Sequence, residues 1–389
     1  WQAGVILSVN RWVRLLTNTP AAWLLGRLPT RMVFTVAILS GGCTSIAYIT
    51  TSFPFFLLAR LAWGASWSVI RLTGLLVVTD CVDAKIATEA SIGQMTGLFS
   101  GLARVGSAVG MAAGGIVSDT LGFDTLFVLA GVLTIAATPF AFTSAFGSLP
   151  RVSATAAKHL ARLEQDRKAE RMCCDAPRLS AAQAQLFALA FAASCAGNGI
   201  IVSTLGAVLA SYSEIDELSG RSSLNLGFVH VDTASFNGVF LAARWALEGL
   251  GAPLFGRVVD HCGWRIIAPA VFTLSCVNGC LGFLLLSAAE EMGNRASGAL
   301  LLLVLVSLVL FFFLASASDL SVKAMGVILR ETPLLVQGND LGAAVGPLLG
   351  YAILQVGLPP SAVLATQALV HGTAALIASS AARSVPPMI

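Results

Sequence analysis

The sequence predicts an all-α polytopic membrane protein, and three observations lead to this fold class. Hydrophobic residues fill 56% of the 389 positions and charged residues only 11%, whereas soluble domains carry about 25% charged residues. The apolar residues gather in eleven runs, each near the length of about 20 residues that a membrane-spanning helix needs. Glycine, which lets helices approach closely in lipid, occurs 37 times. This composition excludes a soluble enzyme and a disordered chain, and a net charge of +3 does not indicate binding to nucleic acid.

The eleven runs predict eleven helices. They lack the alternation of apolar and polar residues that marks the wall of a membrane barrel, so no strand is expected to cross the membrane. The expected spans are residues 1–25, 32–51, 54–79, 93–117, 123–146, 183–211, 234–256, 266–287, 297–318, 335–357 and 361–381.

Basic residues indicate which connections face the cytoplasm, because Lys and Arg are enriched on that side. Outside the spans, 15 basic residues fall in one set of alternate connections and two, Arg221 and Arg295, in the other. The first set includes the polar segment between the fifth and sixth runs and the C-terminal end. We therefore expect an integral protein of a cell or inner membrane whose linker and C-terminus are cytoplasmic.

The one long polar stretch, Gly147–Ser180, is expected to link two bundles. Charge pairs four residues apart, such as Glu164 with Lys168, favour a surface helix, and binding to anionic lipid headgroups is an alternative role. The eight cysteines include no CxxC pair, so free thiols are expected and no metal site. The predicted domains are an N-terminal bundle at 1–150, a linker at 151–182 and a C-terminal bundle at 183–389.

The segments on either side of the linker repeat one another. A shift of 234 residues places the sequence that begins at Gly4 over the one that begins at Gly238, and Arg31 over Arg265. Five runs before the linker match the last five of the six after it, so one helix is expected to be missing before Trp1. A parallel repeat of this kind is typical of transporters that are built from two related bundles.

Three motifs in register with the repeat resemble those of the major facilitator superfamily. Residues 256–265 resemble its cytoplasmic loop motif, residues 60–66 its fourth-helix motif with arginine, and residues 106–115 and 342–350 its glycine-rich motif. The resemblance covers essentially the whole chain and implies two pseudo-symmetric six-helix bundles that carry out secondary transport by alternating access. It also implies a helix-packing role for Gly106, Gly110, Gly114, Gly342, Gly346, Pro347 and Gly350.

The sequence departs from the family pattern at several places. The first loop motif lacks its usual Gly and Asp, His261 replaces an Arg in the second, Met111 stands where many antiporters have Pro, and Trp63 replaces a common Gln. These changes weaken an antiporter assignment. Basic and acidic residues at the cytoplasmic ends nevertheless predict a latch that forms in one end state, with ordinary flanking charge as the alternative. The gating candidates are Arg27, Arg31, Asp80, Asp83, Gly256, Asp260 and Arg265.

Basic groups dominate the charged residues inside the spans. Glu248 and Asp340 are the two acids that lie clearly inside the membrane, and six arginines oppose them. Each arginine costs about 2.5–3.5 kcal/mol at the centre of a bilayer, so such groups are expected to face water, a partner or a ligand. The arginines are Arg11, Arg14, Arg60, Arg71, Arg104 and Arg244.

The spacing of these residues favours a polar cavity. Asn10 and Arg14 share one helical face, and so do Arg244 and Glu248, because each pair is four residues apart. Structural alternatives remain open: Arg244 neutralises Glu248, Arg60 extends to the interface or braces helices, and Arg11 makes an interhelical contact. For the tryptophans and Asn198 the alternative is packing alone. The predicted substrate-binding residues are Arg14, Arg71, Arg104, Arg244, Asn10, Asn198 and Trp67, with Asn198 on a helix loosened by two flanking glycines.

An arginine-rich interior favours an anionic cargo, an organic acid or a phosphorylated metabolite, because the guanidinium group binds carboxylate and phosphate oxygens in pairs. Candidates for proton coupling are Glu248, Asp340, His371 and Arg60, although an interhelical histidine without that role is common. The alternative function is proton-coupled efflux of drugs, in which Glu248 or Asp340 recognises a lipophilic cation.

An enzyme or a receptor is the competing class of function. The four histidines are scattered over separate segments, and no HExxH, GxSxG or Walker sequence occurs, so no catalytic residue, metal or cofactor is expected. The expected partners are a small-molecule substrate and the lipid bilayer, without nucleic acid, and the chain is expected to act as a monomer.

Overall fold

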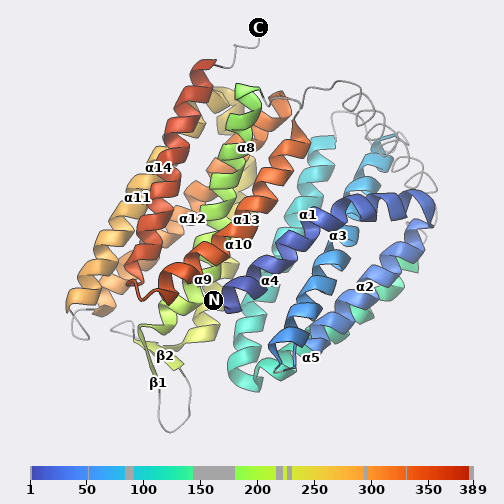
Figure 1. Cartoon of the computed structure of the whole chain (residues 1–389), viewed down its shortest axis with the longest axis horizontal. Helices are drawn as coiled ribbons and strands as arrows, with labels where there is room; N and C mark the ends of the chain where they lie inside the picture. Colours follow the sequence, from blue (N-terminus) through green and yellow to red (C-terminus); the bar gives the residue numbers. More distant parts are fainter. Residues whose placement is uncertain are drawn as a thin grey trace. The chain divides into compact units, whose positions relative to one another are not determined.

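The computed structural model describes residues 2–50, 52–83, 92–142, 180–215, 222–225, 230–292, 297–329 and 331–384. Each of the eleven predicted spans coincides with one helical segment in this part of the chain (Figure 1). Seven segments are long and apolar enough to cross a membrane. The all-α membrane fold is therefore confirmed.

The first five spans correspond to α1 (Gln2–Arg27), α2 (Thr30–Ala47), α3 (Phe53–Asp83), α4 (Ile92–Leu121) and α5 (Phe123–Ala136). The sixth is a continuous helix made of α8 (Ala181–Ser194), the π-helical segment η3 (Cys195–Ile201) and α9 (Val202–Ala210). The last five are α10 (Thr233–Cys262), α11 (Trp264–Met292), α12 (Ser297–Ile328), α13 (Thr332–Gln355) and α14 (Ser361–Ser384).

Two details differ from the expected spans. The run at 123–146 was expected to be a single helix, but α5 ends at Ala136 and a 3₁₀ turn, η2 (Thr138–Phe142), follows it. Pro139 explains the break, because proline disfavours α-helical geometry in the residue before it. In addition, three short strands lie between α9 and α10, outside the spans.

The strands form a small antiparallel sheet in the order β1 (Ser213–Ile215), β2 (Ser222–Asn225) and β3 (His230–Asp232). Leu224 pairs with Ser213 on one side and with Val231 on the other. Its side chain is fully buried and belongs to the same apolar core as Leu209 of α9 and Leu286 of α11. Val231 of β3 packs against the same core, so Leu224 and Val231 attach the sheet to the helices.

The chain divides into two compact units, each of which is described by itself. The larger unit comprises Trp1–Ser8, Arg104–Thr120 and Leu179–Ile389, and the smaller comprises Val9–Ala103 and Leu121–Arg178. The predicted linker at 151–182 lies almost entirely outside the described residues. The predicted boundaries of the bundles therefore stay a prediction.

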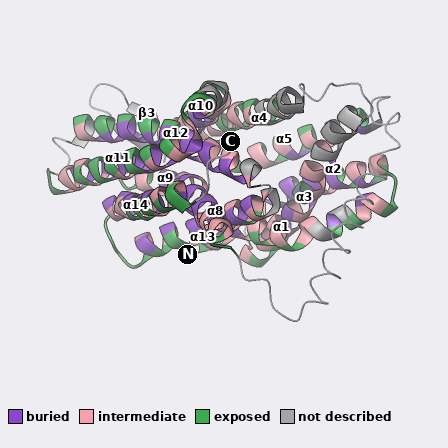
Figure 2. Cartoon of the chain, turned by 90° about the horizontal axis from the view of Figure 1, so that it is seen from above, coloured by how far each residue is buried: buried purple, intermediate pink, exposed green. Residues whose placement is uncertain are grey.

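Burial is distributed unevenly among the spans. In the helix Ala181–Ala210, 67% of the most apolar window is buried, whereas in Phe123–Ala141 only 6% is buried (Figure 2). The helix Ala181–Ala210 therefore packs within its own unit on most sides, whereas Phe123–Ala141 has a broad apolar surface available to lipid.

Glycines set the distance between α13 and the helix Ala181–Ala210. A Cβ atom added at Gly342 would overlap the backbone of Phe191, and one added at Gly346 would overlap that of Gly199. Gly350 lies in the same way beside Thr204. These glycines are four residues apart and therefore share one face of α13, along which the two backbones nearly touch.

The smaller unit uses glycine in a similar way. Gly42 of α2 and Gly131 of α5 approach each other so closely that a Cβ at either position would overlap the other residue's carbonyl oxygen. Gly64 of α3 lies against the backbone of Asn10 in α1. Tyr48, at the end of α2, stacks on Phe56 of α3 with a centroid separation of 4.8 Å.

The N-terminus of α8 has a capping box. The Ser180 hydroxyl accepts a hydrogen bond from the backbone N–H of Gln183, and the Gln183 side chain accepts one from the backbone N–H of Ser180. These bonds satisfy N–H groups that a helix leaves unpaired at its start. The capping box fixes where α8 begins and hence the register of Asn198 further along.

Candidate functional site

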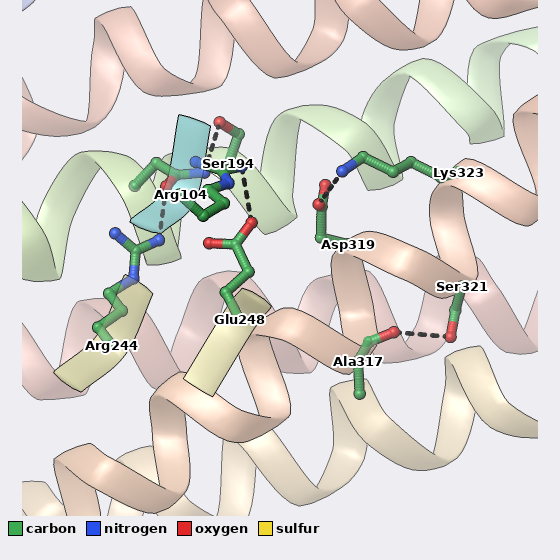
Figure 3. Close-up of polar contacts among 9 residues, drawn as sticks. Arg104, Ser194, Arg244, Glu248, Ala317, Asp319, Ser321 and Lys323 are labelled. Carbon is green, nitrogen blue, oxygen red and sulfur yellow. Dashed lines mark hydrogen bonds and ion pairs between the residues drawn. The ribbon is translucent and has the colours of Figure 1, made fainter. Parts of the chain in front are cut away.

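Two charged residues of α10, Arg244 and Glu248, lie at the centre of the candidate site. The Glu248 carboxylate forms an ion pair with the guanidinium of Arg104 from α4, with 2.7 Å between Nη2 and Oε1 (Figure 3). Arg244 instead donates from Nη2 to the side-chain oxygen of Asn198, at 2.5 Å. Each of the two groups thus finds its hydrogen-bonded partner on another helix, while the charge of Glu248 also acts on Arg244 across one helical turn.

The guanidinium group of Arg244 is buried and only partly satisfied. The residue is 5% exposed, and within the described part of the chain its Nη1 atom has no hydrogen-bond partner. Its charge lies over two aromatic rings, 4.5 Å from the centroid of Trp245 and 5.5 Å from that of Phe312. Cation–π contacts of this kind are worth about 0.5–2 kcal/mol, so they only partly replace the lost hydration.

Trp245 makes cation–π contacts with both arginines of the site. The guanidinium carbon of Arg104 is 4.4 Å from the indole centroid, and that of Arg244 is 4.5 Å from it. Two like charges near one ring repel each other, so the negative face of the indole and the carboxylate of Glu248 together stabilise this arrangement. The indole nitrogen is buried and has no hydrogen-bond partner among the described residues.

Asn198 reaches Arg244 from the π-helical segment η3. The extra residue per turn in such a segment interrupts the regular helix, and segments of this kind are frequent at functional sites. Glycines on both sides permit it: Gly199 lies against Gly346 of α13, and Gly197 is buried. The loosened helix expected around Asn198 is thus present, and the Asn198 amide nitrogen lies 3.5 Å from the hydroxyl of Ser194.

A pocket adjoins Arg244 within the larger unit. It encloses about 330 Å³ not filled by protein atoms, part of which is open to solvent. Its wall combines a cation, acids and amide or hydroxyl groups with apolar side chains. The lining residues are Ala193, Gly197, Asn198, Arg244, Glu248, Phe312, Ala315, Ser316 and Asp319.

Residues of α12 complete the wall. Asp319 forms an ion pair with Lys323 one turn further along, at 2.5 Å (Figure 3). Ser316 is 5% exposed, and its hydroxyl has no hydrogen-bond partner among the described residues. The pocket therefore contains two paired acids and two buried donors, Arg244 Nη1 and Ser316 Oγ, that lack an acceptor.

Several predicted substrate-binding residues belong to the smaller unit. Arg14 of α1 is 4% exposed, and Arg71 of α3 is half-buried. Asn10 lies with its backbone against Gly64, and Trp67 stacks on Trp63 with 6.1 Å between ring centroids. These residues are not among those that line the pocket beside Arg244.

The proposed coupling residues lie in different surroundings. Arg60 lies 5.6 Å from the ring centroid of Tyr48, at the end of α2, which agrees with a bracing contact between helices. His371 is completely buried: its Nδ1 lies 3.0 Å from both the side-chain nitrogen and the backbone oxygen of Gln367, and its ring packs near Phe272 and Phe311. Asp340 of α13 is 4% exposed. Of the four candidates, Glu248 is the one that lines the pocket.

The predicted gating residues are only partly described. Arg27 stacks on Trp23, 4.3 Å from its centroid, and Arg265 lies 6.0 Å from that of Trp264. Arg31 lies on the first turn of α2. The side chains of Asp80, Asp83 and Asp260 and the surroundings of Gly256 lie outside the described residues. The latch therefore stays a prediction.

The glycine-rich stretch of α4 packs differently from the expected pattern. In the part of the chain that the structure describes, no atom lies within 4 Å of a Cβ built on Gly106 or Gly110, whereas Gly115 lies against Ala234 and Gly238 of α10. Neighbouring residues of a helix point in directions about 100° apart. The glycine pattern that includes Gly114 therefore did not reveal that the next residue, Gly115, makes the contact. On α13, Pro347 contributes its carbonyl oxygen to the close contact with Gly4.

Five residues of the site were not anticipated from the sequence. Trp245 follows Arg244 directly, so its position beside a charged residue offered a weak signal. Phe312, Ser316 and Asp319 lie in or at the end of an apolar run where nothing distinguishes them from packing residues, and Ser194 has the same character. Only the helix contacts bring them together.

Comparison with known protein families gives one match. The family described as Major Facilitator Superfamily matches residues 2–331. No curated protein matches the chain.

Proposed function

We propose that this chain, which belongs to the Major Facilitator Superfamily and is a secondary transporter of the membrane, carries a small organic or phosphorylated anion. Further proposals follow from the same family membership and from the distribution of charge. The transporter works by alternating access and as a monomer. Its linker and C-terminus face the cytoplasm. Its partners are the solute and the bilayer.

One observation carries the anionic cargo: the open Nη1 donor of Arg244. The two acids of the same pocket, Glu248 and Asp319, already have cationic partners in Arg104 and Lys323. Arg244 is hydrogen-bonded only to the neutral amide of Asn198 among the described residues, and it lies against two aromatic rings. A carboxylate or phosphate oxygen on the solute would supply both the missing acceptor and the missing negative charge.

The alternative cargo is a lipophilic cation exchanged for protons. Glu248 and Asp319 favour it, because both line the pocket and carry negative charge. Recognition of a cation would require that a solute displace Arg104 or Lys323 from its acid. Arg244 would then remain a buried charge without a hydrogen-bonded acid, close to an added positive charge, which is costly. The anionic cargo avoids this cost.

Uptake into proteoliposomes tests the choice. Full-length protein would be assayed with organic anions, their neutral amides and lipophilic cations of similar size, at membrane potentials of both signs. We expect transport of anions but not of the amides, and loss of at least about tenfold in Arg244→Gln, because a charged hydrogen bond is worth about 1.5–3 kcal/mol. Arg244→Lys should retain part of the activity.

Arg383→Gln provides a matched control. This arginine lies exposed in the last turn of α14, where it bonds to a carbonyl oxygen of its own helix, so its neutralisation should leave transport unchanged. Equal transport of anions and amides, or transport of cations that survives Arg244→Gln, would sink the proposed cargo.

A further inference from the structure

We infer, on the basis of the proposed function, that the pocket beside Arg244 selects a monoanion: a monocarboxylate with a compact apolar body, whose carboxylate binds Arg244 and Ser316. Three properties of the pocket carry this inference. They are its net charge, the positions of its unsatisfied donors and the apolar character of the rest of its wall.

The fixed charges of the pocket leave room for one negative charge. The charged residues that line it are Arg244, Glu248 and Asp319, and the two acids are paired with Arg104 and Lys323. Three cations and two anions leave one net positive charge. A monoanion would neutralise it, whereas a dianion would bring surplus negative charge close to two carboxylates in a medium that screens charge poorly.

The two unsatisfied donors specify where a carboxylate binds. Arg244 and Ser316 are each 5% exposed and both line the pocket. Arg244 Nη1 and Ser316 Oγ have no acceptor among the described residues. A buried donor without an acceptor is costly. One carboxylate group, with two oxygens, can accept from both donors.

The remaining wall is suited to hydrocarbon. Ala193, Ala315 and Phe312 supply methyl groups and an aromatic ring, and Gly197 adds no side chain. Phe312 is 2% exposed and belongs to the apolar core, so its ring has a fixed position. A second polar group of the solute would have no partner where it met these four residues.

Ligand-induced stabilisation of the purified full-length protein tests the charge rule, because a ligand that binds the folded state raises its melting temperature. The probes share one ring: benzoate, benzamide, isophthalate and phenyl phosphate. We expect benzoate to bind at least about tenfold more tightly than the neutral amide, for the loss of a charged hydrogen bond, and more tightly than either dianion. Butyrate tests whether the aromatic ring is needed.

Glu248 provides a sharper test, because its removal changes the charge of the pocket by one unit. Glu248→Gln leaves Arg104 without its acid, so the preference should move from benzoate towards isophthalate. The double variant Arg104→Gln with Glu248→Gln restores the original net charge and should restore the preference for benzoate. Asp124→Asn removes an equal charge from an exposed position on α5 and should change nothing.

Ser316 is tested against its neighbour on the same helix. Ser316→Ala should weaken benzoate binding by about five- to tenfold, the value of one hydrogen bond of roughly 1 kcal/mol or somewhat more. Ser318→Ala is the control, because the Ser318 hydroxyl is bonded to the carbonyl oxygen of Leu314 in its own helix and the residue does not line the pocket.

The outcomes separate this inference from the proposed function. Tighter binding of isophthalate or phenyl phosphate that depends on Arg244 would overturn the monoanion and leave the anion transporter intact. An unchanged affinity for benzoate in Ser316→Ala would overturn the role of Ser316. Binding by none of the anions, with binding of a lipophilic cation instead, would overturn both.

Discussion

Arg244 differs from the other charged groups around the pocket because its hydrogen-bonded partner is neutral. Burial of a guanidinium group is costly unless its charge is compensated, and here two aromatic rings and the oxygen of Asn198 compensate it in part. The oxygen of Asn198 accepts from Nη2, whereas Nη1 has no acceptor among the described residues. The neutral amide thereby preserves the positive charge that the proposed cargo needs.

Asn198 therefore allows a prediction whose sign depends on charge. Asn198→Asp places a carboxylate 2.5 Å from Arg244, and this carboxylate would compete with the solute for the same guanidinium. We expect loss of anion binding by more than about tenfold, with a melting temperature equal to or above that of the parent chain. Asn198→Ala, which only removes the hydrogen bond, should lose less. Calorimetric titration with benzoate and a thermal melt measure the two effects. Binding by Asn198→Asp at the parental affinity would contradict the role assigned to Arg244.

At the scale of elements, the close contact between α13 and η3 positions Asn198. Gly346 and Gly199 meet backbone to backbone, and Gly342 lies against Phe191 and Cys195. Two helices this close leave no room for side chains between them, except where the partner helix lies further away. The π-helical segment therefore depends on glycine in α13 as much as on the glycines that flank Asn198.

Gly346→Ala tests this dependence. The added methyl group would overlap Gly199 and the carbonyl oxygen of Cys195, so the helices must separate, and overpacking of this kind costs about 1–3 kcal/mol. We expect a lower melting temperature in detergent and weaker anion binding, because Asn198 moves away from Arg244. Gly106→Ala is the matched control in the other glycine-rich motif, since no described atom lies within 4 Å of the added methyl group. Equal stability of the two variants would argue against the packing role of Gly346.

Glu290 connects three helix ends in the larger unit. Its carboxylate accepts hydrogen bonds from the backbone N–H of Ser361 at 3.0 Å, the Ser361 hydroxyl at 2.7 Å and the Tyr212 hydroxyl at 3.1 Å. Burial raises the pKa of Tyr212, and the nearby Glu290 raises it further. Ser361 begins α14, Tyr212 follows α9, and Glu290 lies in the last turn of α11, so this one carboxylate fixes how the helices end.

Removal of the carboxylate should therefore loosen the unit. We expect Glu290→Gln to lower the free energy of unfolding by about 1.5–3 kcal/mol, the value of hydrogen bonds to a charged group. Because the pKa of Tyr212 is raised by folding, its contribution is complete below its unfolded value of 10.0 and is lost as the pH rises above it. As the pH rises above about 10, the free energy of unfolding should thus fall less in Tyr212→Phe than in the parent chain. Denaturation curves across alkaline pH measure both effects, and parallel curves would contradict the contact.

At the scale of the whole molecule, the sequence determined the spans more reliably than the site. Span length and hydropathy depend on the bilayer, which acts on every helix alike, so all eleven runs coincide with helices. Partner choice depends on contacts between distant segments: Arg104 and Glu248 are 144 positions apart, and their pairing could not be read from a periodic pattern within one helix. Asn198 was identifiable because its flanking glycines are a local signal, whereas Ser316 has none. The small sheet and the break at Pro139 were missed because each is shorter than a span.

The orientation in the membrane is the remaining property that the whole charge pattern predicts. Fifteen basic residues against two predict that the linker, which contains Cys173 and Cys174, lies on the cytoplasmic side. In a variant whose other six cysteines are replaced by serine, a membrane-impermeant maleimide should label these two thiols in inside-out vesicles but not in right-side-out ones. Glu291→Cys, introduced into a chain without other cysteines, reports on the exposed connection after α11 and should show the reverse. Labelling of both variants from the same side would contradict the topology, because three spans, an odd number, separate Cys173 from the connection after α11: the helix Ala181–Ala210, α10 and α11.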